Sequence, residues 1–128
     1  MAYNILTINP GSTSTKVALF RDMEQVKTLT LRHTAEEIAR TAAIVTTERI
    51  RIENLVVEDL VAMGRAPYTN WVGHLQEIDR TIVNEAIEAV GMEEFIGRDT
   101  SSLSDGELQR VMIARAIAQQ TPIILLDE

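Results

Sequence analysis

The stretch that most constrains the fold runs from residue 100 to residue 128, where a polar turn, a helical pattern and a short apolar run follow one another. Ser104 and Glu107 have the spacing of a capping box, in which each side chain binds the other residue's backbone N–H. Apolar residues then recur at helical spacing, which predicts a helix with one buried face. That face comprises Leu108, Val111, Met112, Arg115 and Ala116.

Gly106 lies inside this turn, where it leaves the backbone N–H groups uncovered. An anion can therefore approach them and the positive end of the helix dipole. After Pro122, the four aliphatic residues 123–126 are typical of a strand that is buried on both faces of a parallel sheet.

Two carboxylates, Asp127 and Glu128, follow this strand directly. The carboxyl end of such a strand is where open α/β sheets bind ligands. We expect Asp127 to hold a magnesium ion through water, and Glu128 to act as the catalytic residue that orients or deprotonates an attacking water.

The string L-S-D-G-E-L-Q-R followed by I-I-L-L-D-E resembles the signature motif and Walker B strand of an ATP-binding-cassette (ABC) ATPase. The usual signature is L-S-G-G-Q, so Asp105 and Glu107 depart from it at the third and fifth positions. The resemblance implies ATP and Mg²⁺ as cofactors, with Ser104 and Gly106 contacting a nucleotide phosphate. A turn, helix and strand without any nucleotide role remain the alternative.

Composition excludes several classes of protein. The 128 residues include no cysteine, so disulfides and thiolate metal sites are excluded. We expect neither secretion nor membrane insertion, because the sequence has no leader pattern and no run of 18 apolar residues. The net charge is −7 without a basic cluster, so nucleic acid is not an expected partner.

The first 32 residues read as three strands, at 4–9, 15–20 and 25–32, with a hairpin between the first two. The intervening turn offers amides, hydroxyls and one cation, which together can cradle a phosphate. A plain hairpin turn is the alternative. The candidate phosphate-binding residues are Asn9, Gly11, Ser12, Ser14 and Lys16.

The fuller stretch Y-N-I-L-T-I-N-P-G-S-T-S-T-K-V-A-L-F resembles the amino terminus of butyrate kinase, in the acetate and sugar kinase superfamily. The resemblance implies a ribonuclease-H-like hairpin with Asn9, Ser12, Ser14 and Lys16 on the phosphate side. Thr34 and Glu37 form a second capping box, which predicts a helix near residue 35. We expect His33 to be a surface residue rather than a catalyst.

From residue 43 onward the chain again resembles an ABC ATPase. The string I-V-T-T-E-R-I resembles the strand and loop that usually carry a glutamine, whose place Thr47 takes. A helix is predicted from 57 to 63, stopped by Gly64 and Pro67. The string G-R-A-P-Y resembles a segment of the importers for iron–siderophores, haem and vitamin B12. Tyr68 and Trp71 are then either loop packing or part of a surface that docks onto the membrane partner.

The region 76–90 has the clearest helical pattern, and Gly91 is a suitable C-cap. Its predicted core face consists of Ile78, Ile82, Val83, Ala86, Ile87 and Val90. Residues 92–100 are predicted to be a connector into the signature turn.

These patterns predict an α/β fold. One small mixed sheet would combine the N-terminal hairpin with buried strands at 43–46 and 123–126, covered by a helical subdomain resembling part of an ABC ATPase. The expected division is a kinase-like segment, 1–42, and an ABC-like segment, 43–128. No stretch matches the phosphate loop G-x-x-x-x-G-K-S/T, the Walker A motif.

The favoured function is an incomplete ABC ATP-binding subunit for import of iron–siderophores or cobalamin. The resemblance implies a membrane permease subunit and a second ATPase subunit as partners, a cytoplasmic location peripheral to the inner membrane, and weak or absent nucleotide binding by this chain alone. The alternatives are a butyrate or acetate kinase fragment and an engineered or recombinant scaffold without activity.

Overall fold

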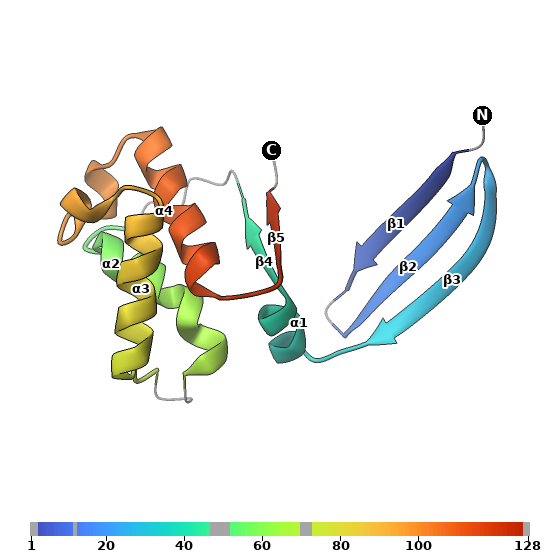
Figure 1. Cartoon of the computed structure of the whole chain (residues 1–128), viewed down its shortest axis with the longest axis horizontal. Coiled ribbons are helices and arrows are strands. Elements are labelled where there is room, and N and C mark those ends of the chain that lie inside the picture. Colours follow the sequence, from blue (N-terminus) through green and yellow to red (C-terminus); the bar gives the residue numbers. More distant parts are fainter. Residues whose placement is uncertain (1–2, 12, 47–51, 70–72, 127–128) are drawn as a thin grey trace. The chain divides into compact units, whose positions relative to one another are not determined.

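A computed structural model describes residues 3–11, 13–46, 52–69 and 73–126. The chain divides into two compact units, residues 1–38 and 39–128, and each is described separately below (Figure 1). Both helices and strands are present, so the predicted α/β class is confirmed.

The first unit is built on an antiparallel sheet in the order β1-β2-β3. Its strands are β1 (Asn4–Pro10), β2 (Ser14–Arg21) and β3 (Glu24–Arg32), which confirms the predicted strands and hairpin. Helix α1 (Ala35–Thr41) then begins at the predicted capping box. There the Thr34 N–H donates to Glu37 Oε2 at 2.7 Å, and the Glu37 N–H donates to Thr34 Oγ1 at 3.1 Å.

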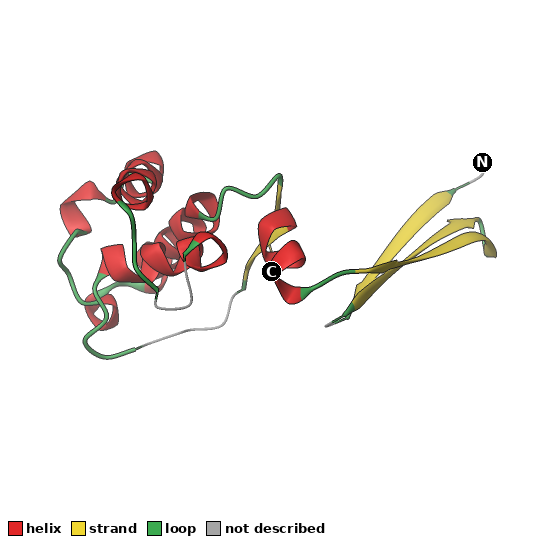
Figure 2. Cartoon of the chain, turned by 90° about the horizontal axis from the view of Figure 1, so that it is seen from below, coloured by secondary structure: helices red, strands yellow, loops and turns green. Residues whose placement is uncertain are grey.

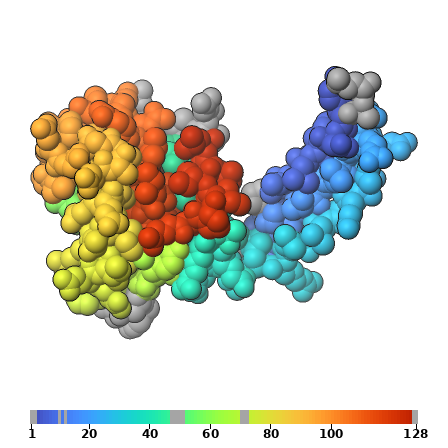
Figure 3. Space-filling model, viewed as in Figure 1, coloured from blue at the N-terminus to red at the C-terminus, as the bar shows by residue number. Residues whose placement is uncertain are grey.

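The second unit is mainly helical, as the secondary-structure colouring makes plain (Figure 2). Helices α2 (Val57–Ala62), α3 (Glu77–Ala89) and α4 (Asp105–Ala118) pack against one another, and α3 lies directly beside α4 (Figure 3). Their shared core is aliphatic and contains the fully buried side chains of Val57, Leu60, Val61, Ile87, Met92 and Val111. Three short 3-10 helices connect them, η1 (Met63–Tyr68), η2 (Glu93–Phe95) and η3 (Thr100–Ser102).

A second, parallel sheet pairs β4 (Ala42–Val45) with β5 (Ile123–Leu126). The expectation of one sheet is therefore wrong, since the described strands form two separate sheets. The expectation that β5 is buried on both faces is also wrong, because Leu126 is 65% exposed and the whole strand lies at the surface. The physical reason is that α4 packs against β4, whereas β5 is paired along only one edge by the described residues.

The predicted helices agree with the structure apart from local details. After α2 the chain tightens into η1, which contains Pro67, rather than stopping at Gly64. Ile78 is 59% exposed, so its assignment to the core was wrong. The inward position in the first turn of α3 belongs to Asp79, whose side chain is buried. Gly91 ends the helix as predicted, with φ of +68°.

Candidate functional site

The signature turn at the start of α4 has the predicted capping box. Ser104 has extended backbone angles, φ −66° and ψ 161°, and its Oγ accepts from the Glu107 N–H at 3.3 Å. Glu107 Oε2 accepts in return from the Ser104 N–H at 2.8 Å. A Cβ added to Gly106 would meet nothing within 4 Å. The glycine therefore leaves open space in front of the helix start, where a ligand can approach.

Charge at this turn works against an anion. Hydrogen bonds from the Ser104 backbone N–H and then from its side chain lower the pKa of Glu107, so the carboxylate is ionised at neutral pH. It also occupies the Ser104 N–H. Within the part of the chain that the structure describes, the Gly106 N–H has no acceptor. The turn thus offers a phosphate the Gly106 N–H and the Ser104 hydroxyl, next to a negative charge.

The segment before the signature turn is fixed by hydrogen bonds to Asp99 and from Thr100. Asp99 accepts from the Ser101 N–H at 2.8 Å and from the Asn54 N–H at 2.9 Å. The Thr100 N–H donates to the Leu55 carbonyl at 2.8 Å. The hydrogen bonds to Asp99 also lower its pKa, beginning with the one from the Ser101 side chain. Sequence reasoning treated 92–100 as a plain connector, although the cap pattern D-T-S-S was a usable signal.

The far end of α4 is held by a buried cation that sequence reasoning missed. Arg65 on η1 is 5% exposed, and its Nε donates to Asp79 Oδ1 at 2.8 Å. Its Nη1 donates to the Ala118 carbonyl at 2.8 Å and to Gln120 Oε1 at 3.0 Å. The string G-R-A-P-Y contained this residue, but periodicity offers no signal that pairs it with a carboxylate 14 residues later.

The partner of this cation is equally enclosed. Asp79 is 3% exposed, and its Oδ2 accepts from the Gln76 N–H at 3.0 Å, which completes a capping box at the start of α3. The hydrogen bond from Arg65 lowers the pKa of Asp79 and outweighs the opposing effect of burial. The ion pair therefore joins η1, the start of α3 and the end of α4.

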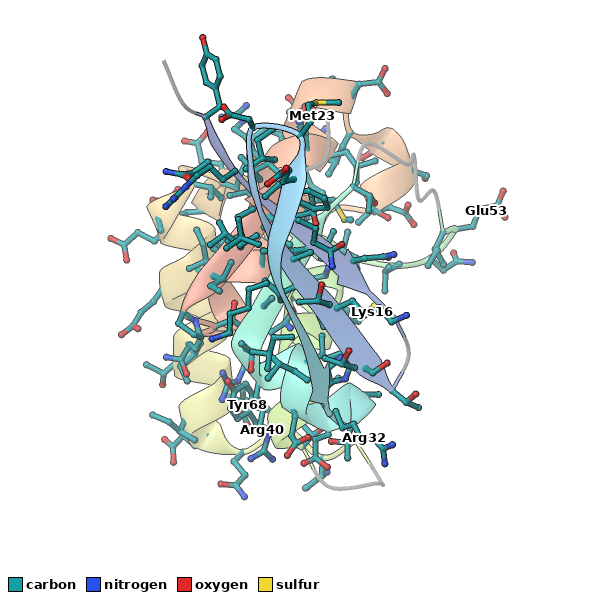
Figure 4. All side chains as sticks on the ribbon, turned by 90° about the vertical axis from the view of Figure 1, so that its right-hand side faces the viewer. Lys16, Met23, Arg32, Arg40, Glu53 and Tyr68 are labelled. Carbon is teal, nitrogen blue, oxygen red and sulfur yellow. The ribbon has the colours of Figure 1, made fainter. Side chains whose placement is uncertain are left out.

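Tyr68 lies at the outer side of this cluster. The Arg65 guanidinium carbon is 4.1 Å from the ring centroid, and that of Arg40 is 5.5 Å from it. Tyr68 and Arg40 are labelled in Figure 4. Arg40 also donates to the Pro67 carbonyl through Nε at 3.2 Å and Nη2 at 2.9 Å. Tyr68 is nonetheless 37% exposed, so it takes part in loop packing and remains available at the surface.

The turn between β1 and β2 is tight. The Gly11 N–H donates to the Ser14 carbonyl at 2.8 Å, and a Cβ at Gly11 would lie 2.9 Å from that oxygen, so this position favours glycine. The Gly11 N–H is therefore already used within the turn. Lys16 is exposed and lies opposite Asn9 in the register, which places both residues on one face of the sheet.

His33 closes this end of the sheet. Its backbone N–H donates to the Thr13 carbonyl at 3.0 Å, and its Nε2 lies 2.7 Å from Thr15 Oγ1. His33 is half-buried, so it is more enclosed than an ordinary surface residue, and its assignment as a surface residue rather than a catalyst stays a prediction. The backbone bond and the threonine contact draw the ring against the sheet.

Several predicted site residues lie outside the described residues, namely Ser12, Thr47, Trp71, Asp127 and Glu128. Their roles stay predictions. Among the residues that are described, no group of three or more metal-binding side chains occurs, and no helix is long and apolar enough to cross a membrane.

A surface groove of about 370 Å³ runs between α2 and α3. Its lining is formed by Glu58, Asp59, Ala62, Leu75, Arg80, Val83 and Asn84. A second hollow of about 290 Å³ shares Asp59, Ala62 and Leu75 and extends along η1. The two hollows together form one groove whose lining combines apolar side chains with Glu58, Asp59 and Arg80.

Known proteins resemble this chain over most of its length. The petrobactin import ATP-binding protein FpuD of Bacillus anthracis is 45% identical over 93 residues, which are 73% of this chain and 34% of FpuD. The iron(3+)-hydroxamate import ATP-binding protein FhuC of Bacillus subtilis is 41% identical over 93 residues, 73% of this chain and 35% of FhuC. The chain thus spans about one third of the length of the curated relatives it matches.

The fold comparison agrees. A solved structure of an inward-facing ABC transporter superposes with a TM-score of 0.67 at 26% identity, covering 82% of this chain and 40% of that one. The family model described as ABC transporter matches residues 7–128. That match extends over most of the segment that resembles butyrate kinase, so the kinase resemblance gains no support from it. Since the family match covers nearly the entire sequence, the chain belongs to the ABC transporter family.

Proposed function

We propose that this chain forms the signature-bearing part of the ATP-binding subunit of an importer for iron–siderophores or for chelates of the cobalamin type. The observation that carries the proposal is the capped turn at Ser104, followed by α4 and then by β5, which runs parallel to β4 toward Asp127 and Glu128. The names of FpuD, a petrobactin import protein, and of FhuC, an iron(3+)-hydroxamate import protein, support the substrate class.

Each site residue has a role in this proposal. Ser104 and Gly106 contact the terminal phosphate of ATP held by a second ATPase subunit. Asp127 would hold Mg²⁺ through water, and Glu128 would orient or deprotonate the attacking water. When bound, ATP would supply the phosphoryl group and Mg²⁺ would neutralise its charge. The open space at Gly106 fits a phosphate, whereas the ionised Glu107 weakens that fit.

The partners follow from the same proposal. A membrane permease subunit docks on the second unit from the cytoplasmic side, and the groove lined by Glu58, Asp59 and Leu75 supports this, because its lining combines apolar side chains with charged ones. Tyr68, exposed beside that groove's extension along η1, is the aromatic residue we place at the docking surface.

The turn at Gly11 supports a second phosphate contact. In this part of the proposal Asn9, Ser12, Ser14 and Lys16 form a kinase-like phosphate-binding hairpin, and the tight Gly11 turn, with Asn9 and Lys16 on one face, is the observation in its favour. A butyrate or acetate kinase fragment is the second candidate function, and the same turn is the observation in its favour. A folded scaffold without activity remains the third candidate, and the exchange experiment below separates it from the importer.

The chain alone is expected not to hydrolyse ATP. Hydrolysis requires the phosphates, a metal ion and a water to be positioned together, and this sequence has no Walker A motif for the first of these. Phosphate release above a blank without protein, abolished by Glu128→Gln, would overturn that expectation.

Exchange of the matching segment tests the proposed function directly. The aligned third of FhuC is replaced by the matching residues of this chain, and uptake of ferric hydroxamate is measured in Bacillus subtilis lacking its own FhuC. We expect uptake to be restored, to be lost with Glu128→Gln, and to be kept with the exposed control Glu85→Gln. A chimaera that purifies with its permease subunits yet supports no uptake would overturn the proposal and favour a scaffold.

A further inference from the structure

A buried arginine lies at the end of the signature helix opposite to the signature turn. The Arg65 guanidinium donates to the carbonyl of Ala118, the last residue of α4, and to Oδ1 of Asp79, the third residue of α3. Carbonyls at a helix C-terminus carry partial negative charge and attract a cation, while a helix N-terminus attracts a carboxylate. The charge of Arg65 is therefore favoured by the C-terminus of α4, and that of Asp79 by the N-terminus of α3.

The backbone of η1 also approaches α4 closely at this point. A Cβ on Gly64 would overlap the carbonyl oxygen of Arg115, one turn before the end of α4. Gly64 thus permits direct backbone contact, and the next residue, Arg65, adds hydrogen bonds to the same helix end. This close approach leaves little freedom for η1 to slide along α4.

A second contact fixes the same helix end from another side. Gln119 Nε2 donates to the Ala39 carbonyl at 2.5 Å and to the Ala42 carbonyl at 3.3 Å. Ala42 is the first residue of β4, so the end of α4 is held between η1 and the parallel sheet. These contacts hold the end of α4 from two sides and oppose a shift of the helix along its axis.

Because α4 is long, a small change of tilt at its C-terminal end moves the signature turn at its N-terminal end. The 14 residues of α4 span about 21 Å at 1.5 Å per residue. A tilt of about 5° about the Arg65 end therefore displaces Ser104 by about 2 Å. Binding groups need to be held within about 0.5 Å of their productive positions, so small changes at Arg65 matter at the signature turn.

The contacts at this end of α4 extend to the surface of the protein. Tyr68 stacks on Arg65 at 4.1 Å and is 37% exposed, and Arg40 flanks the same ring at 5.5 Å. A contact that moves Tyr68 must either move Arg65 with it or lose the stacking energy. The chain of contacts from Tyr68 through Arg65 to Ala118 is continuous.

We propose that Arg65 is a positioning residue that sets the tilt of α4 and transmits displacements of Tyr68 on η1 to the signature turn at Ser104. The inference rests on the proposed function for the meaning of that turn, but the coupling itself concerns the nucleotide-free chain. A purely structural ion pair would affect only its surroundings. The positioning role requires an effect at Ser104, which lies 14 residues before Ala118 at the other end of α4.

Amide NMR on the full 128-residue chain without nucleotide tests the coupling. Arg65→Lys keeps the charge but cannot reproduce the planar fork that bridges Asp79, Ala118 and Gln120. We expect the amide signals of Ser104 and Gly106 to shift by more than in Arg80→Lys, an exposed control on α3. Ring currents from the Tyr68 region are negligible about 20 Å away, so such shifts report a movement of the helix.

Hydrogen exchange gives a second measurement on the same samples. The amides of Gln119 and Gln120, which bond to Arg115 and Ile117, should exchange at least about tenfold faster in Arg65→Lys, since a charge-assisted bond to the helix end is lost. Shifts confined to the neighbourhood of Arg65, Asp79 and Gln120, with Ser104 unmoved, would overturn the proposal.

Two further variants keep the test decisive if Arg65→Lys unfolds. Arg65→Met with Asp79→Leu replaces the buried pair by apolar residues, a change that proteins often tolerate. Tyr68→Leu alters only the partly exposed ring. We expect both to shift the Ser104 amide, and unmoved Ser104 signals in either folded variant would refute the coupling. Failure of the FhuC exchange together with these shifts would remove the import function and leave the positioning role of Arg65 intact.

Discussion

Asp79→Asn is the substitution for which the structure makes the sharpest stability prediction. The change leaves the shape of the side chain almost intact but removes the negative charge that faces Arg65 at 2.8 Å. It also replaces one carboxylate oxygen by an NH₂ group, so either the bond from Arg65 Nε or that from the Gln76 N–H loses its acceptor. A buried arginine with reduced compensation is the result.

The expected loss in the free energy of unfolding depends on which favourable contacts Arg65 keeps. Removing one partner of a buried ion pair typically costs about 3–5 kcal/mol. Arg65 keeps its bonds to Ala118 and Gln120 and its stacking on Tyr68, which places the loss at or slightly below the lower end, about 2–3 kcal/mol. For a unit of this size that corresponds to a melting temperature lower by about 10–15 °C.

Acid should reveal the same pair. The pKa of Asp79 is lowered in the folded chain, chiefly by the hydrogen bond from Arg65. Its ionisation therefore contributes stability above the unfolded pKa of about 3.9, and that contribution is lost as the pH falls through the lower folded pKa. We expect Asp79→Asn to flatten the decline of stability below about pH 4, because the variant has no proton to take up at this position.

Urea denaturation followed by far-ultraviolet circular dichroism measures both effects, since α2, α3 and α4 all belong to the second unit. Glu85→Gln is the matched control, an exposed acid on the same helix, and should change stability by no more than about 0.5 kcal/mol. An Asp79→Asn variant as stable as Glu85→Gln, with an unchanged acid profile, would refute the view that this pair holds the helix ends together.

Three further outcomes are expected. Gly64→Ala should destabilise the second unit by about 1–3 kcal/mol in the same urea assay, because its Cβ would overlap the Arg115 carbonyl; a stabilised variant would contradict the close approach. Ser104→Ala should cost about 1 kcal/mol by loss of the cap, and a loss below about 0.3 kcal/mol would speak against it. In an amide NMR titration with phosphate, the signals of residues 11–16 should shift more than those of 104–108, with roughly millimolar affinity, and the reverse order would place the anion site at the signature turn.

Local features of the fold could be predicted because they depend on short sequence separations. Both capping boxes, at Thr34 and Ser104, need only a serine or threonine and a glutamate three residues later. The strands of the first unit followed from turn residues and alternation. The direction of β5 also followed, since a helix connects it to the preceding part of the chain and four aliphatics favour a parallel neighbour.

Features that depend on distant pairings could not be predicted in this way. Arg65 and Asp79 are 14 residues apart and Arg65 and Ala118 are 53 apart, and because they lie in different elements no helical or strand period relates them. The helical pattern placed Ile78 in the core, because it assigns core positions to apolar residues. The structure gives that position to the buried carboxylate of Asp79, so Ile78 is exposed. The separation of the strands into two sheets is likewise decided by packing, which hydrophobic alternation within one strand does not encode.

The two ends of α4 show how one helix can be stabilised at the expense of a binding surface. At its C-terminus Arg65 supplies the cation that the helix dipole favours, and no ligand is expected there. At its N-terminus Glu107 supplies the favoured carboxylate, but the same charge occupies the Ser104 N–H and lies where the family's usual glutamine would be neutral. The departure from L-S-G-G-Q at Glu107 therefore strengthens the cap and weakens the anion site through the same carboxylate. A chain with this turn retains a well-positioned signature helix. The position of that helix therefore matters more for function than anion binding at the turn.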